Sequence, residues 1–572
     1  MSGNNQSDFE RFQEEYWQWC LNEYPELATW TGDNRYNDRF TDLSWLAIEK
    51  RRAGERQWLI KAQEFDTSRF SEQDILSYRL LMSILDLTVK AQRFPPVLLL
   101  TQIYGPHLDF AQLVSITPFR TLTDYHNYQA RMKAFPAYLD QVIALLWRGI
   151  ETGWVLPYVP LKGIPGQIAG QLTGDPEQSV FYKPLERIPD SISQSDRDSL
   201  RSDTARLISD SVFPALENLR DFVVNTYLPA GKRPIAAREL PDGEAYYAHL
   251  VFEHTTTDMT AAEIHETGKT EVQRIGGQML NVMRQTGFDG SLEDFSSFLR
   301  SDPRFYFTRE DDLVMAYRDI AKRADAELPG LFAELPRNPY GVRAFPDYEA
   351  PGQTTAMYYP GASDGSRAGY FMVNTYRLDM RPKFEMEALV LHEAVPGHHL
   401  QISRAQELRS LTRFRRNASY TAYVEGWALY AESLGDKMGF YTDPYSKFGQ
   451  LMYEMWRACR LVVDTGIHHF GWSRQQAIDY MREQTAKTEQ DIAVEVDRYI
   501  VMPGQALAYK IGELNIRRLR ERAEQELGPE FDIRSFHNAV LDNGALPLPM
   551  LEEQIKKWIY TRRAEPLTDF AL

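Results

Sequence analysis

The chain has 572 residues, with 64 Lys plus Arg against 80 Asp plus Glu, so its formal net charge at pH 7 is −16. An acidic chain lacks the basic surface that a nucleic acid or an anionic membrane would need, so we expect neither partner. Its two cysteines, Cys20 and Cys459, are too few for a disulfide framework or a cysteine-ligated metal. Any metal must therefore be held by histidines and carboxylates.

The start of the chain is polar and shows no basic segment followed by an apolar run, so no signal peptide is visible. No stretch reaches the roughly 18 apolar residues that a membrane-spanning helix needs. We expect a cytoplasmic protein as the sequence stands, and a periplasmic or lipid-anchored one if a leader has been removed.

The N-terminal part of the chain shows a helical pattern. Apolar and aromatic residues at helical spacing predict helices over residues 8–24, 74–89, 123–147 and 195–227. Residues 155–189 are rich in glycine and proline, which predicts a long irregular connection.

A second breaker-rich segment, residues 228–243, is the predicted domain boundary. It separates an N-terminal helical lobe, residues 1–240, from a C-terminal lobe, residues 241–572. One continuous two-lobed domain is the alternative.

The C-terminal lobe begins with a clear helix start. Thr260 lies three residues before Glu263, the spacing of a capping box, and predicts a helix to about Gln285. Residues 354–359 and 370–376 are aromatic and β-branched, with glycines between them, and predict a small antiparallel sheet. The remainder from Pro382 is helical in pattern, so the predicted fold class is mainly α.

Three of the 11 histidines lie in the run His392-Glu393-Ala394-Val395-Pro396-Gly397-His398-His399. The apolar residues 388–391 before it predict a buried helix, and buried charge is costly unless it is paired or bound to a metal. In the common His-Glu-x-x-His spacing the two ligands lie at i and i+4, and the Glu is the general base. Here position i+4 is Pro396, which cannot ligate.

A straight helix cannot bring two of these histidines to one zinc ion. His398 would lie about 9 Å along the axis from His392, and His399 about 10.5 Å, whereas each nitrogen must approach zinc to about 2.1 Å. The chain must therefore bulge, and Pro396-Gly397 permits it. With two residues looped out, His398 takes the place of i+4. We predict His392 and His398 as ligands, with His399 as the alternative or as a substrate contact.

The third ligand should come from a following helix. Glu425 is an acid among apolar residues in the stretch 420–435, and Glu432 lies seven residues later on the same face. We predict Glu425 as the ligand and Glu432 as a hydrogen-bond partner of a ligand histidine. A structural ion pair is the alternative for either residue.

Several motifs together resemble the bacterial family known as domain of unknown function 885. The resemblance is carried by residues 392–401, 425–428, 456–468 and 503–510, and extends to Gly105-Pro106 and residues 254–268. It implies a relationship to the helical gluzincin zinc peptidases, such as angiotensin-converting enzyme, thimet oligopeptidase and the thermostable carboxypeptidases. Those enzymes carry Gly-His at the second ligand, which matches His398, whereas the inserted Val395-Pro396 departs from their pattern. The implied fold is a gluzincin-like helical body with a deep cleft.

The ligand set predicts one Zn²⁺ per chain with a position left for water, and Glu393 as general base. The oxyanion of the intermediate needs a second donor. The related peptidases use a tyrosine from a late position, so Tyr509 is predicted, with Tyr499 as the alternative. The resemblance further implies that the strand at 370–374 pairs with an extended peptide.

The leading hypothesis is a zinc metallopeptidase that acts on short peptides, with carboxypeptidase and dipeptidyl carboxypeptidase as its specialised forms. The predicted substrate contacts are Asn374, His399, His468, Arg498, Tyr499, Gln505 and Lys510. The alternatives are a zinc amidase or esterase on a non-peptide substrate and a catalytically silent peptide-binding protein. Glu393 argues against the last, because a silent site needs no base. The oligomeric state stays open.

Overall fold

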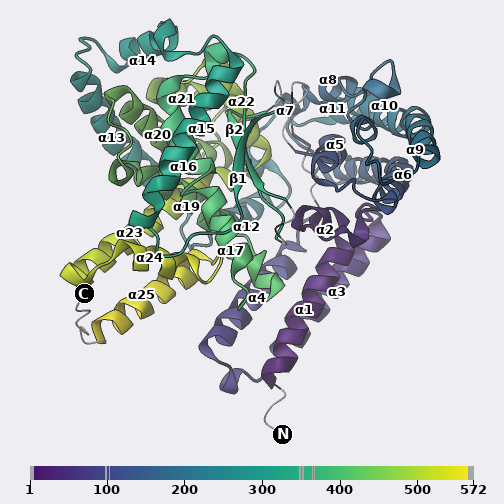
Figure 1. The fold of residues 1–572 in the computed structure, drawn as a ribbon, viewed down its shortest axis with the longest axis horizontal. Helices are drawn as coiled ribbons and strands as arrows, with labels where there is room; N and C mark the ends of the chain where they lie inside the picture. The colour runs from purple at the N-terminus through teal and green to yellow at the C-terminus, as the bar shows by residue number, and fades with distance from the viewer. Residues whose placement is uncertain are drawn as a thin grey trace. The chain divides into compact units, whose positions relative to one another are not determined.

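The computed structural model describes residues 5–96, 100–101, 104–346, 350, 353–363, 365 and 367–564. The fold is mainly helical (Figure 1). It divides into two compact units, of which unit 1 comprises Met1–Ile235 and Glu239–Gly243, and unit 2 comprises Ala236–Arg238 and Glu244–Leu572. The domain boundary predicted from the sequence lies at residue 240, within the segment where the two units exchange.

Unit 1 contains the predicted N-terminal helices. Its helices include α1 (Asn5–Glu23), α2 (Pro25–Thr31), α3 (Trp45–Gln63), α4 (Glu72–Ala91), α5 (Pro106–Ile116), α6 (Leu122–Thr152), α7 (Tyr158–Leu161), α8 (Ile164–Ala169), α9 (Gln194–Leu207), α10 (Phe213–Phe222) and α11 (Leu228–Ala230). The helix predicted over 195–227 is α9 and α10 with a wider turn after each. The predicted irregular connection contains the short α7 and α8.

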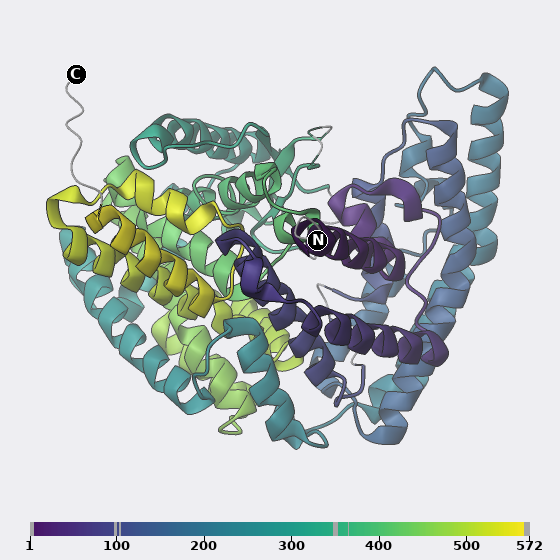
Figure 2. The same ribbon diagram turned by 90° about the horizontal axis from the view of Figure 1, so that it is seen from below.

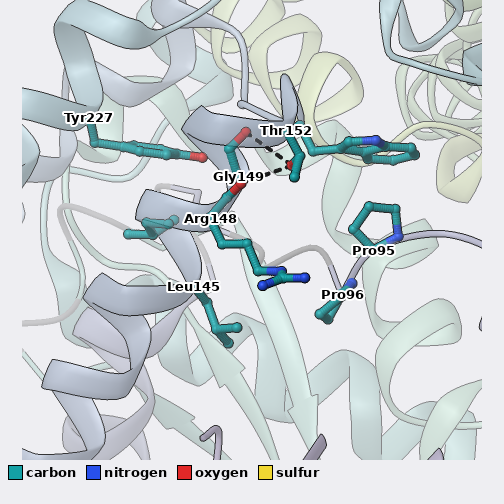
Figure 3. A pocket seen from close by; sticks show the side chains of 9 residues that line it. Pro95, Pro96, Leu145, Arg148, Gly149, Thr152 and Tyr227 are labelled. Carbon is teal, nitrogen blue, oxygen red and sulfur yellow. Dashed lines mark hydrogen bonds between the residues drawn. The ribbon is translucent and has the colours of Figure 1, made fainter. Parts of the chain in front are cut away.

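Local sequence explains where the longest of these helices begins and ends. Thr121 and Asp124 form a capping box at the start of α6, and Gly153 ends it in the left-handed conformation, which glycine adopts without strain. Unit 1 also contains a cavity of about 30 Å³, close to Tyr227 and Gly149 (Figure 3). That volume suits a water molecule and is too small for a peptide.

Unit 2 is built on two tightly packed helix pairs, α13 (Ala261–Gln285) with α20 (Pro444–His468) and α19 (Thr421–Ser433) with α23 (Ala508–Leu527). The predicted capping box of Thr260 and Glu263 starts α13. Gly426 and Gly512 face each other where α19 crosses α23, and a Cβ on Gly512 would collide with a backbone carbonyl of α19. These glycines therefore allow close contact between the two backbones.

Further helices surround these pairs. They include α12 (Gly243–Thr255), α14 (Leu292–Ser301), α15 (Glu310–Glu327), α16 (Met386–Glu393), α17 (His398–Glu407), α18 (Arg413–Arg416), α21 (Arg474–Gln484), α22 (Glu489–Val501), α24 (Ile533–Leu541) and α25 (Leu548–Ala564). Helices α23 and α25 pack on each other, and the C-terminal part of the chain to which they belong is coloured olive to yellow in Figure 2.

A small sheet lies beside α16, with strands β1 (Tyr340–Ala344), β2 (Ala356–Tyr359) and β3 (Gly369–Val373) in the order β1-β3-β2. Strands β2 and β3 are antiparallel, as predicted, but β1 adds a parallel partner on the other side of β3, so the sheet is mixed. Because β3 is the central strand, the expectation that residues 370–374 pair with a peptide is wrong. The free edge next to α16 belongs to β2.

Within the described parts of the chain, no helix combines the length and apolar character that crossing a bilayer requires.

Candidate metal centre

The histidine run is interrupted where the sequence predicts a bulge. Helix α16 ends at Glu393, the Val395–Pro396 peptide is cis, and α17 starts at His398. A Cβ on Gly397 would fall on the carbonyl oxygen of His392, so only glycine fits this turn. The indole N–H of Trp427 donates to the carbonyl of Pro396 at 2.8 Å and fixes the turn against α19.

This turn brings the predicted ligand side chains together. Nε2 of His392 lies 3.7 Å from Oε2 of Glu425, and Nε2 of His398 lies 3.4 Å from the same oxygen. The two imidazole rings are nearly perpendicular, with centroids 4.8 Å apart. One ligand atom from each of His392, Glu393 and His398 also lies within 4.8 Å of the others.

Two carboxylates stabilise the protonated form of His392. Burial opposes its protonation, but the carboxylates of Glu425 and Glu432 overcome this and raise the pKa of His392 to about 9. Burial likewise opposes the charge of Glu425, yet His398 and His392 hold its pKa well below the usual range. The carboxylate of Glu432 accepts from Nδ1 of His392 at 2.7 Å and pairs with Arg457 at 3.2 Å.

The residues present fit a divalent metal ion. Oε2 of Glu425 is buried and has no hydrogen-bond donor, although both imidazoles face it. Three carboxylates, those of Glu393, Glu425 and Glu432, gather around the two histidines with Arg457 as the paired cation. A divalent cation would offset the excess negative charge, and two imidazole nitrogens with one carboxylate oxygen are a typical zinc donor set.

Glu393 is held by the edge of the sheet. Its Oε2 accepts the backbone N–H of Tyr358 in β2 at 2.8 Å. Tyr358 lies opposite Phe371 at a position of the antiparallel ladder where the N–H points away from β3. Since one backbone donor occupies one oxygen, the carboxylate keeps its other oxygen available as a base.

Of the two predicted tyrosines, Tyr509 is the one whose pKa is affected by the charge of a predicted ligand, Glu425. Burial and the negative charge of Glu425 raise the pKa of Tyr509 to about 12, so its hydroxyl stays a donor at neutral pH. Its hydroxyl receives a long 3.4 Å bond from Gln505, and Arg460 stacks over its ring. Tyr499 is buried and its hydroxyl accepts from Arg460 at 3.0 Å, so it is already engaged.

The other residues predicted to contact substrate have their polar atoms engaged within the protein. Lys510 is fully buried among Glu271, Glu454 and Glu513, at 2.7–3.0 Å. Its charge is therefore balanced without a substrate. Nearby, a cavity of about 290 Å³ is lined in part by Arg274 and Arg517, which pair with the same carboxylates.

Asn374, His468, Arg498 and Gln505 likewise make hydrogen bonds within the protein, and their predicted role as substrate contacts stays a prediction. The amide of Asn374 donates to the carbonyls of residues 350, 353 and 354 at 2.8–3.1 Å. His468 accepts the N–H of Ala237 and bonds the carbonyl of Tyr499, each at 2.9 Å. Arg498 pairs with Glu495 at 3.0 Å and bonds Gln505 at 2.7 Å.

The side chain of His399 contacts the sheet. Its Nδ1 lies 2.8 Å from the hydroxyl of Tyr358, and its ring is 2% exposed, so it is buried against the sheet rather than open to a substrate. Burial lowers the pKa of His399 to about 4, which leaves the ring neutral at physiological pH.

Sequence reasoning missed two residues of this region. Tyr358 gives no sequence signal because it acts on Glu393 through its backbone. Asp464 does give one, since it is an acid after the apolar run 461–463, the same signal that identified Glu425. Asp464 is fully buried and accepts the N–H of Gly504, in the turn before Tyr509.

Comparisons with known proteins agree with these motifs. Residues 25–555 match the family model described as a bacterial protein of unknown function, domain of unknown function 885. No curated protein matches the chain.

Two solved structures are similar over nearly their whole length. One is from Colwellia psychrerythraea, is described as a candidate lipoprotein, and shares 27% identity over 97% of this chain and 100% of its own, with a TM-score of 0.93. The other, a candidate lipoprotein of unknown function from Shewanella oneidensis, shares 18% identity over 96% of this chain and 99% of its own, with a TM-score of 0.69. The second likeness is one of fold alone.

Proposed function

The chain belongs to the bacterial family of domain of unknown function 885, and for this member we propose a zinc-dependent metallopeptidase that hydrolyses short peptides. The observation that supports it is that Nε2 of His392 and Nε2 of His398 face one oxygen of Glu425, with the Glu393 carboxylate beside them. Two imidazoles, one carboxylate ligand and an adjacent free carboxylate are the groups that metal-assisted hydrolysis of an acyl bond needs.

Each of these side chains has a defined task. His392, His398 and Glu425 would hold one zinc ion, which when bound supplies a Lewis acid and lowers the pKa of water. Glu393 takes the proton of the attacking water and passes it to the leaving amine. Glu432 accepts from Nδ1 of His392, which leaves Nε2 as the nitrogen that would hold the ion.

Tyr509 is the proposed donor to the oxyanion of the tetrahedral intermediate. Its hydroxyl is protonated at neutral pH and lies in the field of Glu425. Arg460, stacked 4.3 Å above the same ring, has a buried Nη1 without a hydrogen-bond partner. Glu495 already pairs with Arg460 at 3.1 Å, so this Nη1 is the part of the guanidinium proposed to bind a substrate C-terminal carboxylate, in the carboxypeptidase forms of the activity.

The free edge of β2 supports a peptide as substrate. Residues 356 and 358 of β2 direct their backbone groups away from β3, as the alternation of an antiparallel ladder requires. The Tyr358 N–H donates to Glu393 and the Ala356 carbonyl accepts from Thr354, so an extended chain would add to this edge through its remaining backbone groups. Tyr358 lies on that edge and holds Glu393, so the bound peptide would run beside the base.

We further propose a periplasmic or lipid-anchored location. The support is the similarity to the Colwellia psychrerythraea protein, which is described as a candidate lipoprotein.

The decisive experiment combines metal analysis with peptide cleavage. Zinc is quantified in the purified protein, and the wild type, Glu393→Gln and the surface control Glu334→Gln are incubated with a mixed short-peptide library. Products are read by mass spectrometry. We expect one zinc per chain, cleavage by the wild type and the control, and a loss of at least about 1000-fold in Glu393→Gln.

Other results would reject the proposal. Equal cleavage by wild type and Glu393→Gln would exclude Glu393 as the base. One zinc per chain without peptide cleavage would favour a zinc amidase or esterase that acts on a non-peptide substrate. A chain that binds no zinc would exclude both the peptidase and this alternative.

A further inference from the structure

The second histidine of the pair lies at the meeting point of α17 and the sheet. Nδ1 of His399 is 2.8 Å from the hydroxyl of Tyr358 on β2 and 3.2 Å from the hydroxyl of Ser403, one turn later on α17. The ring of Tyr340 on β1 packs against the His399 ring with centroids 4.6 Å apart. His399 therefore contacts the two outer strands of the sheet at once.

The central strand is shaped to allow this contact. Gly369 of β3 lies between Tyr340 and Tyr358, and a Cβ at this position would collide with the hydroxyl of Tyr358. The missing side chain lets the Tyr358 ring lie across β3 and reach His399. The arrangement is thus formed by side chains of two strands and one helix, with a glycine of the third strand making room for them.

Tyr358 also holds the proposed general base. The side chain of Tyr358 bonds His399, while its backbone N–H donates to Oε2 of Glu393 at 2.8 Å. The position of that N–H is fixed by where the β2 edge lies relative to α17. Since α17 begins at His398, the same helix carries a proposed zinc ligand and the anchor of the strand that orients Glu393.

We propose that the hydrogen bond between Tyr358 and His399 is a latch that positions Glu393 for catalysis, and that His399 is a positioning residue rather than a zinc ligand or a substrate contact. The latch comprises these two side chains. It keeps the β2 edge at a fixed distance from the start of α17, so that the Tyr358 N–H sets the direction of the Glu393 carboxylate toward the two ligand histidines. This inference rests on the proposed role of Glu393 as base.

The latch is tested with Tyr358→Phe, His399→Phe and the double variant. Each single variant removes one side of the same hydrogen bond and retains a ring. We expect kcat to fall about 10-fold with KM within about twofold, because a base moved from its aligned position loses rate rather than binding. The double variant should lose about 10-fold as well, not about 100-fold, because both changes remove one interaction.

Two readouts do not depend on cleavage. Zinc content should stay at one per chain in every variant. Hydrogen exchange of the Tyr358 amide, followed in residues 353–363, should accelerate about 10-fold or more in each latch variant, as the N–H loses its fixed acceptor. Tyr340→Phe is the matched control, because it keeps its ring on His399 and loses only the bonds of its hydroxyl to Asp325 and to the carbonyl of Ala321. Its kcat and amide exchange should equal those of the wild type.

Three results would overturn the latch: unchanged kcat and amide exchange in the single variants, additive losses in the double variant, or loss of zinc in His399→Phe alone, which would make His399 a ligand. A wild type that cleaves no peptide, with accelerated exchange in the variants, would support the positioning contact and reject the proposed function. If the wild type cleaves peptides and the latch variants show unchanged kcat and amide exchange, the proposed function is supported and the latch is rejected.

Discussion

The buried carboxyl group of Asp464 should make the free energy of unfolding depend on pH. It lies fully buried in α20, where it accepts the hydroxyl of Tyr247 at 2.6 Å and the N–H of Gly504 at 3.1 Å from each oxygen. Burial nevertheless raises the pKa of Asp464 to about 7. The folded protein therefore keeps this carboxyl protonated in a range where the unfolded chain has released the proton.

The sign and size follow from linkage. Because the folded state binds the proton more tightly, Asp464 stabilises the fold at acidic pH, and this contribution disappears as the pH rises toward the folded pKa. With an unfolded pKa of about 3.9 and a folded pKa of about 7, the loss between pH 5 and pH 8 is about 2.5 kcal/mol. For a unit of about 330 residues this corresponds to about 3–4 °C in Tm.

The substitution Asp464→Asn isolates this contribution, since asparagine retains the shape and an acceptor oxygen but has no proton to release. Thermal unfolding of both proteins is measured between pH 5 and pH 8 with a chelator present, so that metal binding does not contribute. We expect the Tm of the variant minus that of the wild type to increase by about 3–4 °C across this range. Asp311→Asn, at a site 86% exposed, is the control for losing a surface carboxylate. A difference that stays constant with pH would show that Asp464 is charged in the folded state and refute the reasoning.

Three further predictions concern the candidate metal centre directly. Glu432→Gln should weaken zinc binding about 10- to 100-fold, measured by competition with a chelator, because Nδ1 of His392 loses its charged acceptor. Gly397→Ala should lower zinc content and destabilise the protein by about 1–3 kcal/mol or more in denaturant unfolding, because its Cβ meets the His392 carbonyl. Tyr509→Phe should keep its zinc and lose about 100- to 1000-fold in kcat, and a normal rate would exclude it as oxyanion donor.

The helices were predictable because their signals are local. The capping box of Thr260 and Glu263, and the apolar spacing of α1, α4 and α6, lie within the elements that they define. Strand β1 was missed because its pairing is not local. Its residues Tyr340–Ala344 pair in parallel with β3, which begins 25 residues after β1 ends. The sequence therefore has no hairpin turn that would indicate this pairing.

In the candidate site, too, the sequence predicts what depends on short segments and misses contacts between distant ones. The proximity of His392, His398 and Glu425 followed from helix geometry and from charge placed among apolar residues, which are properties of short segments. The partners of Lys510 did not follow, because Glu271 and Glu454 come from α13 and α20, far away in the sequence. A cation beside a site motif is free for substrate only if no distant carboxylate already balances it, and that condition depends on the tertiary structure.

The interruption between His392 and His398 explains why two adjacent histidines can do different work. In a helix, neighbouring side chains point about 100° apart. Because α17 starts anew at His398, the first histidine faces Glu425 on α19 while His399 turns toward Tyr358 on the sheet. In an uninterrupted helix, the direction of α16 would fix the position of a ligand at i+4 and also that of the residue after it. The second side chain could then reach the sheet only if the direction of α16 happened to allow it. The break at Val395 and Pro396 thus separates two requirements, the approach of a second imidazole to Glu425 and the anchoring of the strand that holds Glu393.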